Sequence, residues 1–355
     1  MSNAVWRLAR KPPAGWPVAE DFRWQHEIMP EPGPDQMLTR TIYLSLDPYQ
    51  WGRRRSGTEQ PGDICHGRTV SQVLRSRLKG YIDGDIVFNT NGWQAYGLTG
   101  ANVDVFGYMF PRKIDPQLAP ISTAIGILGM LGLTAYAGLV VQCEPKPGDT
   151  IVVSAASGGV GQVVCQLGRI YGCRVVAIAG SNEKLEYLKS LGVDAVVSHR
   201  SADFSEELRH ACPDGCDIYF ENVGGAVFDA VLPLLNDQSR IALCGLISQY
   251  GNVDGQDPRS RWRAVGSAVF ERNRVSVHDL FVGNFVADYQ DRFLEEMGAY
   301  VRAGEVQYLE DKRHGLENTP EVFAQMLRGE NFGKTLMVVS EDPTLTDAEG
   351  RQIAV

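Results

Sequence analysis

The chain has 355 residues, of which 44% are hydrophobic and 22% are charged, and its formal net charge is −9. This composition is ordinary for a globular protein, and the length favours two domains. A net negative charge provides no general attraction to nucleic acid or anionic membranes, so neither is expected as a partner.

The first 125 residues are rich in proline and glycine and contain short alternating runs, such as those at 36–46 and 84–88. Such runs between closely spaced turns predict an all-β module. The cluster Arg53-Arg54-Arg55 is interpreted as a solvated basic loop. The loop Trp51–Arg55 and residues 93–96 are also a candidate lining for an aromatic or acidic substrate, although plain surface loops explain both segments equally well.

Seven cysteines are scattered along the chain, and several of them lie in apolar segments. An odd number without paired spacing indicates reduced thiols, which predicts a cytoplasmic protein. Charges and two prolines interrupt the N-terminal segment, so a secretory signal peptide is not expected.

Residues 118–141 contain no charged side chain and are numerous enough to cross a bilayer. Glycines at positions 126, 129, 132 and 138 interrupt the run, which is therefore only moderately apolar. A buried helix pair at a domain junction is predicted here, in place of a membrane span.

After residue 125 the pattern changes to alternating helices and strands, with strands expected at 150–154, 174–179, 194–198, 216–221 and 240–244. This alternation predicts an α/β domain with a doubly wound parallel sheet. The last strand-like run, at 333–339, is expected to rejoin the first module. Two domains of this kind predict a cleft that holds a substrate.

A glycine turn follows the predicted strand at 150–154 and leads into an amphipathic helix. Its spacing, Ala156-x-Gly158-x-x-Gly161, is the dinucleotide-binding pattern with alanine in place of the first glycine. A helix N-terminus after such a turn favours a phosphate group. We predict a pyrophosphate site at Ala156, Ser157, Gly158, Gly159, Val160 and Gly161; the alternative is a turn that only tightens the strand–helix connection.

The end of the next strand indicates which dinucleotide binds. An NAD site places an acidic residue there, whereas this chain has Gly180 and Ser181. Lys184 follows on the first turn of a helix for which Ser181 is the expected N-cap. A cation at a helix N-terminus suits a 2′-phosphate, so NADPH is predicted as the cofactor. Glu183 argues against this unless it is a solvated residue of the first turn.

Several motifs resemble those of one family in order along nearly the whole chain. They are Leu46-Asp47-Pro48-Tyr49, Gly129-x-x-Gly132-Leu133-Thr134-Ala135-Tyr136, Ala155-Ala156-Ser157-Gly158-x-Val160-Gly161-Gln162, Gly180-Ser181-x-Glu183-Lys184, Phe220-Glu221-Asn222-Val223-Gly224-Gly225, Cys244-Gly245-x-Ile247-Ser248-x-Tyr250 and Gly329-x-Asn331-x-Gly333-Lys334. In these motifs the chain resembles the zinc-independent medium-chain dehydrogenases/reductases, specifically the NADPH-dependent alkenal double-bond reductases, which include leukotriene B4 dehydrogenase/prostaglandin reductases and curcumin reductases.

The resemblance implies a GroES-like β-rich catalytic domain at 1–125 and 310–345, a Rossmann domain at 126–309, a tail at 346–355 and a homodimer. It also implies roles for single residues. Lys184 would bind the 2′-phosphate, with His199 and Arg200 in place of a supporting tyrosine, and Asn222 and Asn331 would contact the cofactor. Tyr250 would face the substrate carbonyl, and Tyr49 is a weaker candidate for lining the pocket.

A catalytic zinc is not expected. Such a site needs three protein ligands, and Cys65-His66-Gly67-Arg68 provides two candidates with no acidic residue beside them. Packing and hydrogen bonding are the simpler interpretation of Cys65 and His66.

The predicted activity is therefore NADPH-dependent reduction of the C=C bond of an α,β-unsaturated ketone or aldehyde. Hydride would add to the β-carbon, and Tyr250 would donate a hydrogen bond to the carbonyl oxygen as it becomes negative. The α-carbon proton would come from Tyr250 or water. Two alternatives stay open at this point, an NADPH:quinone reductase and a nonenzymatic NADPH-binding module.

Overall fold

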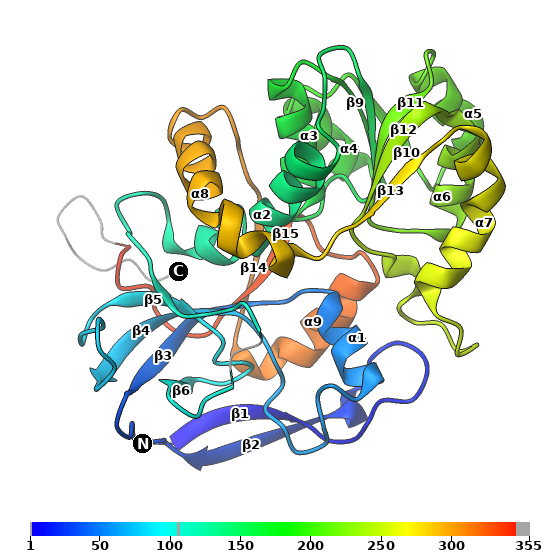
Figure 1. Ribbon diagram of the computed structural model, residues 1–355. Helices are drawn as coiled ribbons and strands as arrows, with labels where there is room; N and C mark the ends of the chain where they lie inside the picture. The colour runs from blue at the N-terminus through cyan, green and yellow to red at the C-terminus, as the bar shows by residue number, and fades with distance from the viewer. Residues whose placement is uncertain (1, 105–106, 346–355) are drawn as a thin grey trace. The chain divides into compact units, whose positions relative to one another are not determined.

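The computed structural model describes residues 2–104 and 107–345, and the chain divides into two compact units. One unit comprises the described residues up to Gly129 together with those from Glu310 onward, and the other is Met130–Leu309. Both are drawn in Figure 1. The expected tail at 346–355 lies outside the described residues.

The unit Met130–Leu309 contains a six-stranded parallel sheet with the strand order β10-β9-β8-β11-β12-β13. Its strands are β8 (Thr150–Val153), β9 (Arg174–Ala179), β10 (Ala195–Ser198), β11 (Cys216–Glu221), β12 (Leu235–Leu243) and β13 (Ser276–Asp279). Numbered along the chain, this is the 3-2-1-4-5-6 order of dinucleotide-binding doubly wound folds. The predicted α/β fold class is thus confirmed.

Helices cover both faces of this sheet. They are α3 (Gly161–Ile170), α4 (Asn182–Ser190), α5 (Phe204–Ala211), α6 (Gly225–Val231) and α7 (Pro258–Arg272), and α8 (Val286–Arg302) follows them. In Figure 1, α3 and α4 lie on one side of the sheet and α5, α6 and α7 on the other. The central strand β8 is buried along its whole length, which explains its uninterrupted apolar sequence.

Two strands differ from the prediction. Strand β12 begins at Leu235, earlier than expected, because its first part carries exposed polar residues such as Asp237 and Gln238. Strand β13 was not predicted. It is an edge strand with no fully buried residue, so it lacks the apolar run on which the other strands were recognised.

The apolar segment at 118–141 does not form the predicted helix pair. It contains a 3-10 helix, η2 (Ile121–Ile125), and the short helix α2 (Met130–Tyr136), which continues as a π-helix, η3 (Ala137–Gln142). Glycine is required between them, since a Cβ on Gly129 would lie 2.2 Å from the carbonyl oxygen of Ala124. Among the described residues no helix combines the length and apolarity needed to cross a membrane.

The other unit is built on a mainly antiparallel sheet with the order β14-β15-β3-β4-β5-β7, and β6 also pairs with β3. Its strands are β3 (Gln36–Ser45), β4 (Thr69–Ser76), β5 (Ile86–Asn89), β6 (Tyr96–Gly100), β7 (Arg112–Lys113), β14 (Glu310–His314) and β15 (Lys334–Val338), beside a ribbon of β1 (Ser2–Leu8) and β2 (Phe22–Ile28). Strand β15 pairs with β3, which confirms that the last strand rejoins the first module.

This unit is not purely β. It also contains α1 (Tyr49–Ser56) and α9 (Thr319–Leu327). The predicted basic loop Trp51–Arg55 is therefore part of a helix, and both Trp51 and Arg54 are fully buried. The prediction failed because the sequence of three arginines does not reveal Glu59, which lies 3.0 Å from the Arg54 guanidinium inside the unit. The two units also contain short 3-10 helices, which are η1 (Ala19–Asp21), η4 (Leu232–Leu234), η5 (Ile247–Gln249), η6 (Val282–Phe285) and η7 (Leu316–Asn318).

Candidate active site

The turn between β8 and α3 has the close backbone packing that the glycine pattern predicted. The backbone N–H of Ala156 donates to the carbonyl of Ile178 at 2.9 Å, which fixes the turn against β9. A Cβ on Gly161 would lie 2.4 Å from the carbonyl oxygen of Ala155, so no larger residue fits there. Ala156 and Ser157 are buried, whereas Gly158, Gly159 and Val160 are partly accessible at the N-terminus of α3.

Strands β8 and β11 are neighbours at the point where the strand order reverses. In open α/β sheets this switch point, at the carboxyl ends of the strands, is where ligands bind. Asn222, which follows β11, donates from its side-chain amide to the carbonyl of Ser154 at 2.8 Å, and its backbone N–H donates to the Ser154 hydroxyl at 2.8 Å. The fold thus brings the predicted residue Asn222 to the end of β8.

Glu221 organises the same edge of the sheet. Its carboxylate is fully buried and accepts hydrogen bonds from the backbone N–H groups of Val223 and Gly224 at 2.8 and 3.0 Å. Burial raises its pKa, although these bonds act in the opposite direction. The Ser154 hydroxyl and the Trp262 indole also donate to it, at 3.1 and 3.0 Å.

Sequence reasoning missed Glu221 and Ser154 as site-building residues. The sequence did contain a sign of Glu221, because it is an acidic residue at the end of an otherwise apolar strand. A carboxylate buried at such a position needs hydrogen-bond donors around it.

The residues predicted to bind a 2′-phosphate gather around Gly180. A Cβ on this glycine would lie 2.6 Å from His199 Nε2 and 3.2 Å from Arg200 Nε, so the absence of a side chain makes room for both. Partial burial lowers the pKa of His199, and the positive charges of Arg200 and Lys184 lower it further. The Ser181 hydroxyl accepts from the backbone N–H of Lys184 at 3.4 Å, which confirms Ser181 as the N-cap of α4.

Tyr250 lies beyond the carboxyl end of β12, directly after η5. Its hydroxyl is 3.1 Å from the position that a Cβ on Gly245 would occupy, and the backbone N–H of Gly245 donates to the carbonyl of Glu221 at 3.0 Å. Burial raises the pKa of Tyr250, so its phenol is protonated at neutral pH. Tyr250 therefore belongs to the same edge of the sheet as Asn222.

Tyr49 and Asn331 belong to the other unit. The Tyr49 hydroxyl lies 2.8 Å from His66 Nε2, and its ring faces the buried guanidinium of Arg68. The side-chain amide of Asn331 donates to the carbonyl of Gly333 at 2.9 Å, within its own turn. The roles predicted for these two residues stay predictions.

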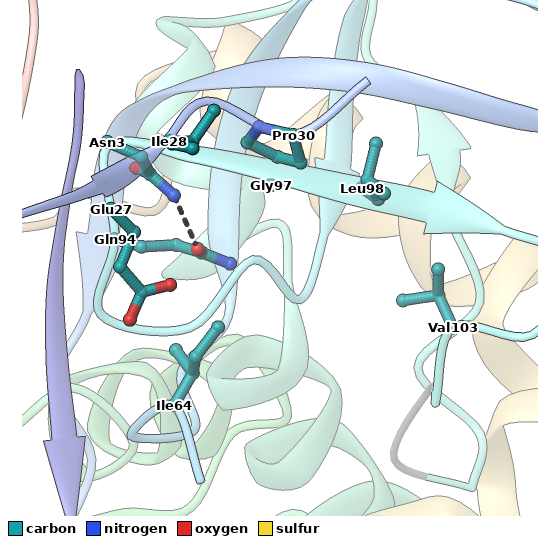
Figure 2. Close-up of a pocket in the computed structure, with 9 residues that line it drawn as sticks. All are labelled: Asn3, Glu27, Ile28, Pro30, Ile64, Gln94, Gly97, Leu98 and Val103. Atoms are coloured by element: carbon teal, nitrogen blue, oxygen red, sulfur yellow. Dashed lines mark hydrogen bonds between the residues drawn. The ribbon is translucent and has the colours of Figure 1, made fainter. Parts of the chain in front are cut away.

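A cavity of about 240 Å³ lies in this unit, and none of the predicted catalytic or cofactor-binding residues lines it, although Gln94 of the candidate segment 93–96 does. Figure 2 shows its lining residues, among which the Asn3 side chain donates a hydrogen bond of 3.0 Å to Gln94. The cavity is lined by Asn3, Glu27, Ile28, Pro30, Ile64, Gln94, Gly97, Leu98 and Val103.

Comparison with known proteins relates this arrangement to a family. Residues 5–104 match the N-terminal domain of oxidoreductase, and residues 159–298 match the zinc-binding dehydrogenase family. The chain is 40% identical to the NADPH-dependent curcumin reductase of Escherichia coli, over 96% of this chain and 98% of that protein. It is 38% identical to the NADP(+)-dependent 2-alkenal reductase of Nicotiana tabacum, over 92% and 95% of the two chains.

The chain belongs to the medium-chain dehydrogenase/reductase family, in the branch of the curcumin and alkenal reductases. The fold of this chain is also similar to that of a solved structure from the same branch. CurA from Vibrio vulnificus in complex with NADPH superposes with a TM-score of 0.86 at 38% identity, and the match covers 96% of this chain and all of that one.

One of the two matched families is called zinc-binding dehydrogenase, but the described residues of this chain do not provide a set of ligands for a zinc ion. Across residues 2–104 and 107–345 no three or more His, Cys, Asp or Glu side chains are grouped so that they could hold a metal ion. Cys65 is fully buried, which raises the pKa of its thiol, and His66 Nε2 is hydrogen-bonded to Tyr49. We therefore derive no step through zinc.

Proposed function

We propose that this family member reduces the C=C bond of α,β-unsaturated ketones or aldehydes with NADPH. The observation that carries the proposal is the cluster of Lys184, His199 and Arg200 around Gly180, at the end of the second strand of a dinucleotide-binding sheet. A 2′-phosphate suits the two cations Lys184 and Arg200 and a hydrogen bond from the His199 imidazole, and no acidic residue stands in the position that holds a ribose 2′-hydroxyl in NAD sites. The named activities of the relatives support the same proposal.

Different residues of Met130–Leu309 would bind different parts of the cofactor. The turn at Gly158–Gly161 and the N-terminus of α3 would receive the pyrophosphate, because backbone N–H groups and the helix dipole favour an anion there. Lys184, His199 and Arg200 would bind the 2′-phosphate. Asn222, held by Ser154, would orient the nicotinamide end at the switch point.

Bound NADPH supplies the hydride that is added to the β-carbon of the substrate. The C=C electron pair then forms a double bond between the α-carbon and the carbonyl carbon, and the carbonyl π pair moves onto the oxygen, where a hydrogen bond from the Tyr250 hydroxyl stabilises the negative charge of the enolate. The α-carbon receives a proton from Tyr250 or from water, and the product is the saturated ketone or aldehyde. A protonated Tyr250 is suited to this donor role, since burial raises its pKa.

The experiment is to follow the loss of NADPH absorbance with the purified protein and four acceptors: an aliphatic enal, an aryl enone, a benzoquinone and a saturated aldehyde. The proposal predicts turnover with the enal and enone, weaker activity with NADH and no effect of a chelator. Turnover of the quinone alone would identify a quinone reductase. NADPH binding without turnover of any acceptor would identify a nonenzymatic module.

We further propose that the protein works as a homodimer in the cytoplasm. The dimer is the expectation from the family resemblance, and its test is the mass measured by sedimentation. The location is supported by seven free cysteines, six of them buried, which suit a reducing compartment.

A further inference from the structure

Glu221 is a fully buried carboxylate in the unit Met130–Leu309, and the proposed reaction does not use it. The groups that donate hydrogen bonds to it are all neutral. They are the hydroxyls of Ser154 and Tyr219 at 3.1 and 2.9 Å, the Trp262 indole at 3.0 Å, and the backbone N–H groups of Val223 and Gly224 at 2.8 and 3.0 Å. Burying a carboxylate is costly unless it is hydrogen-bonded, so Glu221 and its donors hold one another in place.

Two of these bonds determine the course of the loop after β11. The backbone N–H groups of Val223 and Gly224 both donate to the same atom, Oε1 of Glu221. Gly224 has a φ of 75°, a conformation that side chains other than glycine rarely adopt, so the chain turns sharply at this point. The loop therefore folds around one oxygen of the carboxylate.

The same loop holds the segment that contains Tyr250. Backbone N–H groups between β12 and Tyr250 donate to the carbonyl groups of residues 221–223. The pairs are Cys244 and Gly245 with Glu221, both at 3.0 Å, Ile247 with Asn222 at 3.1 Å, and Ser248 with Val223 at 3.1 Å. The N–H of Tyr250 then donates to the carbonyl of Ile247 at 3.2 Å. The position of Tyr250 thus depends on the course of residues 221–224.

We propose that Glu221 is a positioning residue for Tyr250, and that it acts through the backbone of residues 222–224 and 244–248. The catalytic role of Tyr250 rests on the proposed function, whereas the connection between Glu221 and Tyr250 does not. Glu221 itself cannot touch a substrate, since it is fully buried and enclosed by its donors. A shift of about 1 Å in a reacting group can lower a rate by about 10²-fold, so loss of this connection has a measurable effect.

The test measures the rate of hydride transfer to an aryl enone in a single turnover, so that product release does not affect the result. We expect E221A to slow hydride transfer by about 10- to 100-fold. In E221Q the amide oxygen can still accept from Val223 and Gly224, so the rate stays within about threefold of the wild type. The matched control is D217A, at the opposite end of β11, where the carboxylate accepts from the backbone N–H of Thr150 at 2.8 Å. We expect the wild-type rate in D217A.

The double variant E221A/Y250F separates positioning from a merely structural role. Residues that act as a unit have non-additive effects, so E221A should cost less than about threefold once the Tyr250 hydroxyl is absent. An equal loss in the wild-type and Y250F backgrounds, or a wild-type rate in E221A, would overturn the proposal. If E221A does not fold, the same comparison is made with E221D, whose carboxylate is one methylene shorter in reach.

A second measurement does not depend on turnover. The tyrosines are replaced by 3-fluorotyrosine, and the fluorine NMR line of Tyr250 is identified by its loss in Y250F. We expect this line to shift or broaden in E221A and to keep its position in D217A.

The two proposals fail in different ways. If the wild type reduces no enone, the proposed function is wrong, while a changed Tyr250 line in E221A still supports the connection. If the enone is reduced but E221A changes neither the rate nor the line, the positioning role is wrong and the reductase activity stands.

Discussion

In the proposed reaction, the hydroxyl of Tyr250 stabilises the negative charge that develops on the substrate carbonyl oxygen. Substitution by phenylalanine keeps the ring and removes the donor. We expect Tyr250→Phe to lower kcat by about 10²–10³-fold, as loss of one oxyanion donor does, with the KM for NADPH nearly unchanged. Tyr289→Phe on α8 is the matched control, and full turnover by Tyr250→Phe would show that another group stabilises the charge.

Lys184 tests the choice between the two nicotinamide cofactors. Lys184→Ala removes the ammonium group and with it the proposed charge-assisted contact to the 2′-phosphate of NADPH. NADH has no 2′-phosphate, so its binding would lose no such contact. We expect the KM for NADPH to rise by about 10- to 100-fold and the KM for NADH to change little. Lys189→Ala serves as the control, because Lys189 is on the same helix and pairs with the exposed Glu186 at 2.7 Å. Equal effects on both cofactors would contradict the assignment.

At the scale of elements, the turn between β8 and α3 depends on a glycine. A methyl group at position 161 would be 2.4 Å from the Ala155 oxygen and 2.7 Å from the Ala156 Cα atom, both of them backbone atoms that cannot rotate away. We expect Gly161→Ala to lower the free energy of unfolding by about 1–3 kcal/mol, the usual cost of overpacking, and to weaken NADPH binding.

Denaturant unfolding followed by circular dichroism measures this change. The control is Gly52→Ala in α1, where no atom lies within 4 Å of the added Cβ and alanine is the better helix former. Equal stability of Gly161→Ala and the wild type would mean that the turn can rearrange without cost.

For the whole molecule, the buried charges near Tyr49 make stability depend on pH. The pKa of His66 is about 3 in the folded chain and ordinary in the unfolded chain, so below pH 6.5 the unfolded state binds one more proton. The free energy of unfolding therefore falls as the pH is lowered from about 6.5 toward 3. Arg68 and Lys334 hold the pKa of Asp47 low against the effect of its burial, which adds to the loss in acid.

His66→Gln separates the two contributions, because Asp47 is unchanged in the variant. We expect the slope of unfolding free energy against pH between 4 and 6 to be smaller in His66→Gln than in the wild type, by at most about 1.4 kcal/mol per pH unit. Urea unfolding at a series of pH values provides the slopes. Identical slopes would show that His66 is protonated in the folded chain.

Much of the site could be predicted because its parts are local. Lys184 lies three residues after its N-cap Ser181, and both residues follow the end of β9. One short segment therefore contains the pattern that predicts the 2′-phosphate site. Glu221 could not be found in this way. Its donors come from the residue after β8, from the loop after β11 and from α7, and these meet only after folding.

The sequence by itself determined the features that act over a few residues: the strand–turn–helix at β8 and α3, the cap of α4, and the alternation that requires a parallel sheet. Tertiary structure alone decided the strand order that places Asn222 against Ser154, the pairing of β15 with β3, and the burial of Arg54 and Arg68. The physical reason is that periodicity and glycine geometry are set by neighbours in sequence. Strand partners and buried ion pairs are instead set by packing between segments that are far apart in the chain.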